Sequence, residues 1–300
     1  ILCSCGSNES AEKPSAASSD TAARDSSLAT TAAAGSRDNT PVVLTGSADG
    51  TVTYGNDSVT VDASHTQEGY LMVSYSGSNS KVKLQITGSD EITYTYNLHD
   101  GYETFPLTSG SGSYTVGVFE NIEGTSYSTL FTQAIDVTIQ DEFGPYLYAN
   151  QYVNFSADSK VISKAMELSA SANDDLEVIE NVYNYIITNF TYDYDKAASV
   201  QSGYLPDVDE VLASQTGICF DYAAVMASML RCERIPTRLE VGYMGDVYHA
   251  WISTYIKDKG WVNGIIEFDG NDWKLMDPTF ASTSSDPKDF LTQTDEYITK

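Results

Sequence analysis

The chain has 300 residues, 41% hydrophobic and 19% charged, which is enough for about two domains that each bury a core. Its 42 acidic and 16 basic residues give a formal charge of −26, and this field argues against nucleic acid as a partner. The four cysteines, at positions 3, 5, 219 and 232, do not make a disulfide framework.

The first residues contain a short cysteine motif. Leu2, Cys3, Ser4 and Cys5, in this order, resemble the lipobox of bacterial lipoproteins. The resemblance implies a longer precursor, cleavage before Cys5, acylation of its thiol, and an extracytoplasmic protein anchored to the bacterial cell membrane by lipid. We therefore interpret residues 1–5 as a lipobox remnant; the alternative is an apolar stub that contains cysteine by chance.

Residues 6–40 are predicted to be a disordered tether. They are rich in Ser and Ala, and Leu28 is their only large aliphatic residue. Such a segment cannot bury enough apolar surface to offset its ordering entropy. A flexible chain of about 35 residues spans roughly 30–35 Å. No run of 18 or more apolar residues follows that could cross a bilayer.

Residues 41–145 are dense in strand patterns. Lys81–Ile86 alternates polar and apolar residues, as a half-buried strand does, and similar segments lie near residues 59–61, 70–75, 92–96, 114–119 and 131–139. Six or seven short strands with turns every 8–12 residues predict a β-sandwich, immunoglobulin-like in the broad sense. No chemistry is expected here: His65 and His99 are interpreted as solvated or capping histidines.

Residues 146–300 are predicted to form an α+β domain. Helices are expected at residues 159–170 and 175–190, the second capped by Asp174, and a third helix follows Gly217. Strands are expected at residues 238–243, 247–256, 265–268 and 273–276, with a hairpin turn at 269–271.

Three residues of this domain can form a thiol site. Cys219 falls at a helix N-terminus, whose partial positive charge favours the thiolate and whose N–H groups can stabilise an oxyanion. A thiol nucleophile needs a base beside it, and the base needs an acceptor that fixes its tautomer. His249 is the only histidine after residue 145, and Asp277 ends the last of the expected strands.

The motifs around these residues resemble the transglutaminase-like superfamily. The matching blocks, in chain order, are Gly217-x-Cys219-x-Asp221-Tyr222-Ala223, Arg231 with Ile235-Pro236, His249-Ala250-Trp251, and Asp277-Pro278-Thr279. The resemblance implies a papain-like fold and a catalytic triad of Cys219, His249 and Asp277. The longer stretch from Trp261 to Trp273 is expected to shape the rim of the site.

Other residues of the domain are assigned lesser roles. Gln215 is a candidate oxyanion donor, and Tyr222, Tyr248 and Trp251 are candidates for the substrate cleft, although core packing is the alternative for Trp251. Cys232, at the far end of the same helix, is expected to be a buried structural thiol. Asp193, Asp195, Asp207 and Asp209 are interpreted as a solvated acidic loop that could also hold a cation. No metal site and no cofactor is expected.

These residues predict an enzyme that acts on amide bonds of peptides or proteins through a thioester. Water as the acceptor makes it a cysteine peptidase or amidase, and a lysine-type amine makes it a protein-crosslinking transglutaminase. The expected location outside the cytoplasm favours hydrolysis. The alternative from another class is a non-catalytic surface protein that binds a partner through the β-sandwich.

Overall fold

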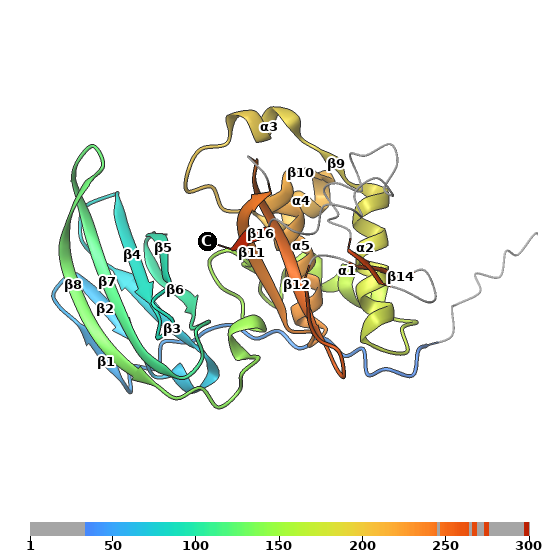
Figure 1. The fold of residues 1–300 in the computed structure, drawn as a ribbon, viewed down its shortest axis with the longest axis horizontal. Coiled ribbons are helices and arrows are strands. Elements are labelled where there is room, and N and C mark those ends of the chain that lie inside the picture. Colours follow the sequence, from blue (N-terminus) through green and yellow to red (C-terminus); the bar gives the residue numbers. More distant parts are fainter. Residues whose placement is uncertain (1–33, 245–246, 264–265, 269–272, 276–296, 300) are drawn as a thin grey trace, which may run out of the picture. The chain divides into compact units, whose positions relative to one another are not determined.

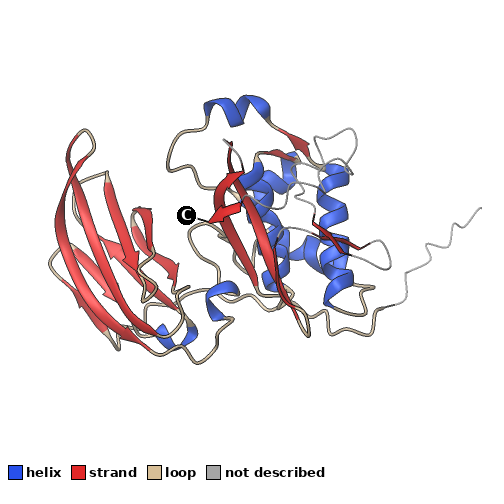
Figure 2. Ribbon diagram, in the orientation of Figure 1, coloured by secondary structure: helices blue, strands red, loops and turns tan. Residues whose placement is uncertain are grey.

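The computed structural model describes residues 34–244, 247–263, 266–268, 273–275 and 297–299, and Figure 1 shows these in colour. Strands dominate the first part, and helices join them in the second (Figure 2). Within the described residues, no helix is long and apolar enough to cross a membrane. The lipobox remnant, with Cys5, lies outside the described residues.

The first part contains two antiparallel four-stranded sheets. One has the order β1-β2-β3-β6 and the other the order β5-β4-β7-β8. Their bounds are β1 Thr53–Gly55, β2 Val59–Asp62, β3 Tyr70–Tyr75, β4 Val82–Thr87, β5 Thr93–Leu98, β6 Gly101–Pro106, β7 Gly112–Glu123 and β8 Ser126–Val137, with a short 3-10 turn, η1, at Thr66–Glu68. The strands predicted from the sequence are present, whereas β1 and β6 were not predicted. Gly124 takes a left-handed φ of 54° at the turn between β7 and β8.

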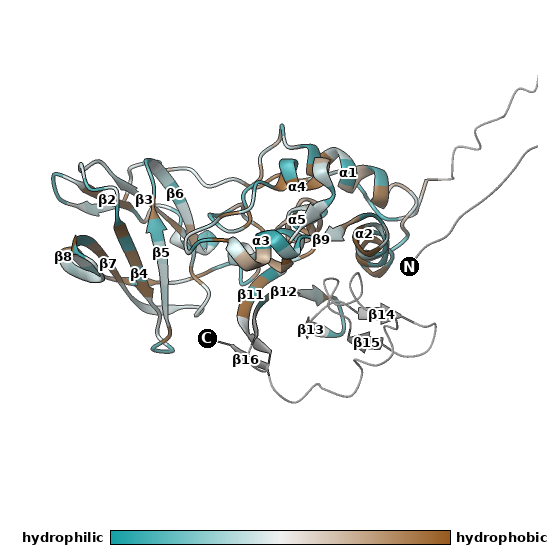
Figure 3. Ribbon diagram, turned by 90° about the horizontal axis from the view of Figure 1, so that it is seen from above, coloured by the Kyte–Doolittle hydropathy of each residue, from teal (hydrophilic) through white to brown (hydrophobic). Residues whose placement is uncertain are grey.

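Alternation along the strands builds one shared core. In β4 the side chains of Val82, Leu84 and Ile86 are buried while those between them are half-buried, as the sequence pattern predicts. The hydrophobic residues of this strand stand out in Figure 3. They join buried residues of both sheets in a single cluster. The two sheets therefore form a β-sandwich around one core, and its immunoglobulin-like character stays a prediction.

The second part combines five helices with several sheets within the described residues. Its elements are η2 Gly144–Tyr146, α1 Lys160–Ser169, α2 Asp175–Asn189, β9 Thr191–Tyr192, α3 Tyr194–Ser199, α4 Val208–Ser214, β10 Thr216–Gly217, α5 Cys219–Cys232, β11 Thr237–Met244, β12 Val247–Ile256, β13 Gly260–Asn263, β14 Ile266–Phe268, β15 Trp273–Leu275 and β16 Tyr297–Thr299. The main sheet has the order β13-β12-β11-β16, and β14 pairs with β15 as the expected hairpin.

Helix α5 is the centre of this part. It packs against α1, α2 and α4 and against β11 and β12 of the sheet (Figure 1). Every residue from Asp221 to Cys232 is buried, which fits a helix that is apolar nearly all round. Its polar members have internal partners: Arg231 donates to the carbonyl oxygens of Thr237, at 2.9 and 3.0 Å, and Tyr148, at 2.7 Å.

The predicted acidic loop is wrong, because this stretch contains α3 and α4. Asp193 caps α3 by accepting the backbone N–H of Lys196 at 2.8 Å. Asp207 caps α4 by accepting two backbone N–H groups, each at 3.0 Å. Short helices of this kind have weak apolar periodicity, so the aspartates that cap them were mistaken for a solvated loop. Asp174 caps α2, as predicted.

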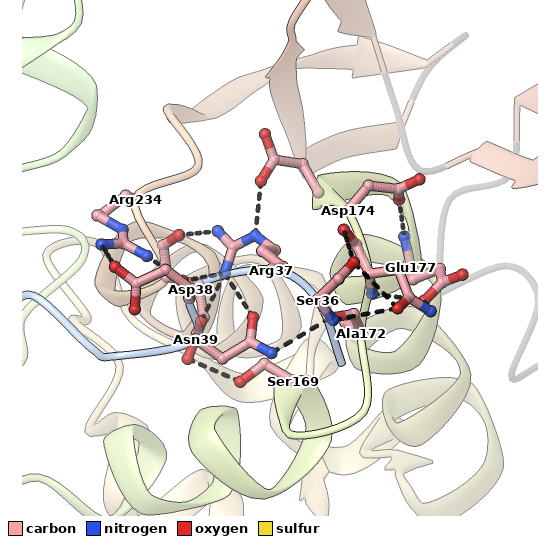
Figure 4. Close-up of polar contacts among 12 residues, drawn as sticks. Ser36, Arg37, Asp38, Asn39, Ser169, Ala172, Asp174, Glu177 and Arg234 are labelled. Atoms are coloured by element: carbon pink, nitrogen blue, oxygen red, sulfur yellow. Dashed lines mark hydrogen bonds and ion pairs between the residues drawn. The ribbon is translucent and has the colours of Figure 1, made fainter. Parts of the chain in front are cut away.

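The predicted tether is also too long, because residues 35–39 lie against the second part (Figure 4). Arg37 forms ion pairs with Asp175 at 2.7 Å and with Glu233 at 3.0 Å. Asp38 pairs with Arg234 at 3.0 Å. The low apolar content of this segment did not predict the interaction, because ion pairs with distant residues hold the segment, and a hydrophobic stripe does not.

The burial of Glu233, whose effect on its pKa Arg37 partly offsets, should make the stability of the protein depend on pH. Glu233 is fully buried and also accepts a hydrogen bond from Ser169, and burial, the dominant effect, raises its pKa. A raised pKa in a folded carboxyl group means that stability falls as pH rises from the unfolded pKa through the folded one. Arg37→Met removes the buried partner and should raise this pKa further. We expect a loss of about 3 kcal/mol in the free energy of unfolding near neutral pH, and a smaller loss near pH 4.

Urea unfolding at both pH values measures this difference. Arg234→Met is the matched control, because it also removes one positive charge, but its pair with Asp38 is exposed. The control should change little at either pH. Equal losses for Arg37→Met at the two pH values would contradict this account of Glu233.

Candidate active site

Cys219 is the first residue of α5 and the accessible end of a buried helix. Its side chain is partly exposed, whereas the twelve residues that close the helix are all buried. Ile218 precedes it in extended conformation, with a φ of −102° and a ψ of 177°. The predicted position at the helix N-terminus is thus confirmed, and the backbone N–H groups of the first turn lie beside this residue.

A buried carboxylate holds the start of the helix. Asp221 accepts a hydrogen bond from the backbone N–H of Ile218 at 2.8 Å, so a side chain of the first turn caps the N-terminus of the helix. Gly217 passes so close that an added Cβ would come within 2.6 Å of the Asp221 Cβ. The glycine is therefore required by this close approach, and the segment before Cys219 has little freedom to change.

Two residues that the sequence did not single out contact this carboxylate. Lys196 of α3 lies 2.7 Å from Asp221 Oδ2, and the hydroxyl of Tyr204 donates to Oδ1 at 2.6 Å. Burial acts to lower the pKa of Lys196, but the hydrogen bonds to Asp221 and Tyr204 outweigh it, and the pKa is raised. A buried carboxylate needs partners, so the place of Asp221 within the motif could have indicated a nearby cation. It could not have indicated which residue supplies that cation.

His249 lies on β12, opposite Gly242 of β11. It is 4% exposed, and its ring lies nearly parallel to that of Trp251, with 6.4 Å between the centroids. Since α5 packs against β12, the elements that carry Cys219 and His249 are neighbours in the fold. Asp277 lies outside the described residues, so its place in the triad stays a prediction.

The remaining predicted site residues have other contacts. The Gln215 side chain donates to the Tyr185 hydroxyl at 3.3 Å, and its backbone takes a left-handed φ of 51° at the end of α4. Tyr222 is completely buried, with its ring against Phe190. The indole N–H of Trp251 donates to Glu240 at 2.9 Å. These contacts favour packing for Tyr222 and Trp251, and contact of any of the three with substrate stays a prediction.

Two further predictions are Tyr248, for the substrate cleft, and the stretch from Trp261 to Trp273, for the rim of the site. Tyr248 lies in β12, and its side chain is outside the described set. Trp261 starts the stretch expected to shape the rim, and the guanidinium of Arg238 lies over its ring, 3.7 Å from the centroid. The ring of Trp261 also meets that of Tyr146 edge to face. Phe220, directly after Cys219, makes edge-to-face contacts with the rings of Tyr152 and Tyr204, and no sequence pattern had marked it as a candidate.

Comparison with known proteins identifies a family for the part of the chain that contains Cys219 and His249. Residues 162–264 match the model of the transglutaminase-like superfamily, so this part of the chain belongs to that superfamily. A curated relative, the UPF0252 protein MJ1282 of Methanocaldococcus jannaschii, is 28% identical over 89 residues, which cover 28% of this chain and 24% of that protein. The chain therefore matches about a quarter of that relative's length.

Two solved structures show weaker likenesses. A Cytophaga hutchinsonii protein named "putative cysteine protease" is 18% identical, with a TM-score of 0.37 over 67% of this chain and 72% of that one. Red sea bream transglutaminase is 13% identical, with a TM-score of 0.31 over 72% of this chain and 48% of that one. At these TM-scores neither likeness assigns a common fold.

The two described cysteines should differ sharply in reactivity. Cys232 is fully buried, and burial raises the pKa of its thiol to about 12. Below that pH its thiol stays protonated, and it is also out of reach of solvent. We expect iodoacetamide at about pH 8 to modify Cys219 and leave Cys232 unmodified, with both modified in concentrated urea. Peptide-resolved mass spectrometry measures each thiol separately, and early labelling of Cys232 would contradict the buried position.

Proposed function

We propose that this protein is a thiol enzyme that acts on amide bonds of peptides or proteins, with Cys219 as nucleophile and His249 as base. The observation that carries the proposal is the position of Cys219: a partly exposed thiol at the first residue of a buried helix, in a domain of the transglutaminase-like superfamily. The helix N-terminus favours the thiolate and supplies N–H groups for an oxyanion. The packing of α5 on β12 supports His249 as its partner.

The reaction would proceed through a thioester. The Cys219 thiolate attacks the carbonyl carbon of the amide, a C–S bond forms, and negative charge collects on the carbonyl oxygen. Protonated His249 then gives its proton to the leaving nitrogen as the C–N bond breaks. Asp277 would accept the other ring N–H of His249 and so fix its orientation.

The acceptor of the acyl group decides the class of enzyme. When water attacks the thioester, His249 takes its proton, and a free carboxylate and the Cys219 thiol are released. When a lysine-type amine attacks, a new amide forms and two chains are joined. We propose hydrolysis as the main reaction of a lipoprotein that is anchored through Cys5 outside the cytoplasm and meets peptide substrates there.

The first test is the pairing of Cys219 with His249. We expect Cys219 to react with iodoacetamide well below the range of an ordinary thiol, whose pKa is about 8.5, and to lose that behaviour in His249→Ala. Labelling of each thiol is followed against pH by mass spectrometry, with Cys232 as internal check on folding. His99→Ala, which removes an exposed histidine of the sandwich, is the matched control and should leave the profile unchanged.

Two outcomes would count against this function. If Cys219 reacts only where an ordinary thiol does and His249→Ala changes nothing, the site is not that of a thiol enzyme, and binding by the β-sandwich becomes the better account. If Gln-containing peptides release ammonia and incorporate an added amine, and do so faster than they are hydrolysed, transamidation replaces hydrolysis.

A further inference from the structure

The cluster of Asp221, Lys196 and Tyr204 lies next to the proposed nucleophile and outside its chemistry. The Asp221 side chain is fully buried, two residues after Cys219. It accepts three hydrogen bonds, from the N–H of Ile218, the ammonium of Lys196 and the hydroxyl of Tyr204. Its carboxylate therefore has partners on both oxygens, from two separate segments of the chain.

The charge of this carboxylate opposes the proposed role of Cys219. A helix N-terminus favours a thiolate through its partial positive charge, and a nearby negative charge disfavours it. Asp221 is in the first turn of the same helix and is shielded from water, so its charge is weakly screened. The same carboxylate also holds the backbone of Ile218, directly before Cys219, through a hydrogen bond.

Lys196 supplies the compensating charge. Its ammonium lies 2.7 Å from Asp221, 2.7 Å from the Tyr204 hydroxyl and 4.4 Å from the centre of the Tyr204 ring. The lysine side chain is 27% exposed, so most of its length is buried along this path. The hydroxyl of Tyr204 binds both charged groups and fixes their separation, and its pKa is raised to about 12 by burial and by the bond to Asp221, so it remains a donor.

We propose that Lys196, with Tyr204, is a positioning residue for Cys219: it neutralises the buried Asp221 carboxylate and so leaves the start of α5 favourable to the thiolate. This inference deepens the proposed function and rests on it, because it concerns the same thiol. Under this proposal, α3 and the loop that leads from it to Tyr204 influence the protonation of the Cys219 thiol.

The test is the pH profile of Cys219 alkylation in the full chain, read by peptide-resolved mass spectrometry. Lys196→Met should leave the Asp221 carboxylate without its cation and move the pH of half-maximal labelling upward by about one unit. That shift corresponds to about tenfold slower labelling on the rising part of the profile. Lys196→Arg keeps the charge and should restore most of the original profile.

Lys164→Met is the matched control. Lys164 forms an ion pair with Glu167 at 2.5 Å and also lies over a tyrosine ring, that of Tyr185, 5.0 Å from its centre. The variant removes the same charge from the whole protein and a similar pair from a different helix. Cys219 in this variant should be labelled with the same pH profile as in the chain without substitutions. A shift equal to that of Lys196→Met would overturn the proposal, because the shift would then come from the change in net charge.

A second variant keeps the test decisive if Lys196→Met unfolds, which labelling of the buried Cys232 would reveal. Tyr204→Phe removes one donor to Asp221 and keeps Lys196, so it should move the profile upward by less than Lys196→Met does. No movement in a folded Lys196→Met chain, or in Tyr204→Phe where Lys196→Met unfolds, overturns the proposal.

The two proposals fail separately. In one outcome, Cys219 of the chain without substitutions is labelled at low pH, His249→Ala abolishes this labelling and Lys196→Met does not change it. The proposed thiol enzyme is then supported, and the proposed role of Lys196 is wrong. If the unmodified chain labels Cys219 only as an ordinary thiol, yet Lys196→Met still moves the profile upward, the electrostatic role of Lys196 stands and the thiol enzyme is wrong.

Discussion

The complete burial of α5 from Asp221 to Cys232 is the constraint on which the second part of the structure depends. A buried helix gains from its apolar side chains, but each polar group that it carries must find a partner inside the protein. The hydroxyl of Ser228 donates to the Ala224 carbonyl one turn back. Arg231 and Asp221 cannot be satisfied by their own helix, so they recruit partners from distant segments and thereby fix those segments in place.

The recruited partners lie at opposite ends of the helix. At the start of the helix, Asp221 binds Lys196 of α3 and Tyr204. At its end, Arg231 donates to the carbonyl oxygens of Thr237 and of Tyr148, which precedes α1. Glu233, just beyond the helix, holds Arg37 of the N-terminal segment. The helix is therefore tied at both ends by charged groups that would be costly to leave unpaired.

This arrangement has a consequence for chemistry. Burial makes most of α5 inaccessible, and only its first two residues are partly exposed. A thiol placed at that end combines access with the electric field of the helix, while Cys232 at the other end is protonated and enclosed. The same helix thus carries one cysteine suited to react and one suited only to pack, and the difference comes from position along the axis.

Local sequence patterns were sufficient to predict most of the longer strands and helices and the candidate nucleophile, but not the short helices α3 and α4. Strict alternation in β4 and the apolar stripe of α2 are local patterns, and so is the helix that begins at Cys219, because each depends on residues a few positions apart. The partners of the buried charges are visible only in the fold, because they come from distant positions in the sequence. Lys196 lies 25 positions from Asp221, and Arg37 lies 196 positions from Glu233. Nothing local marks such pairs, because the demand for them arises when folding removes the carboxylates from water.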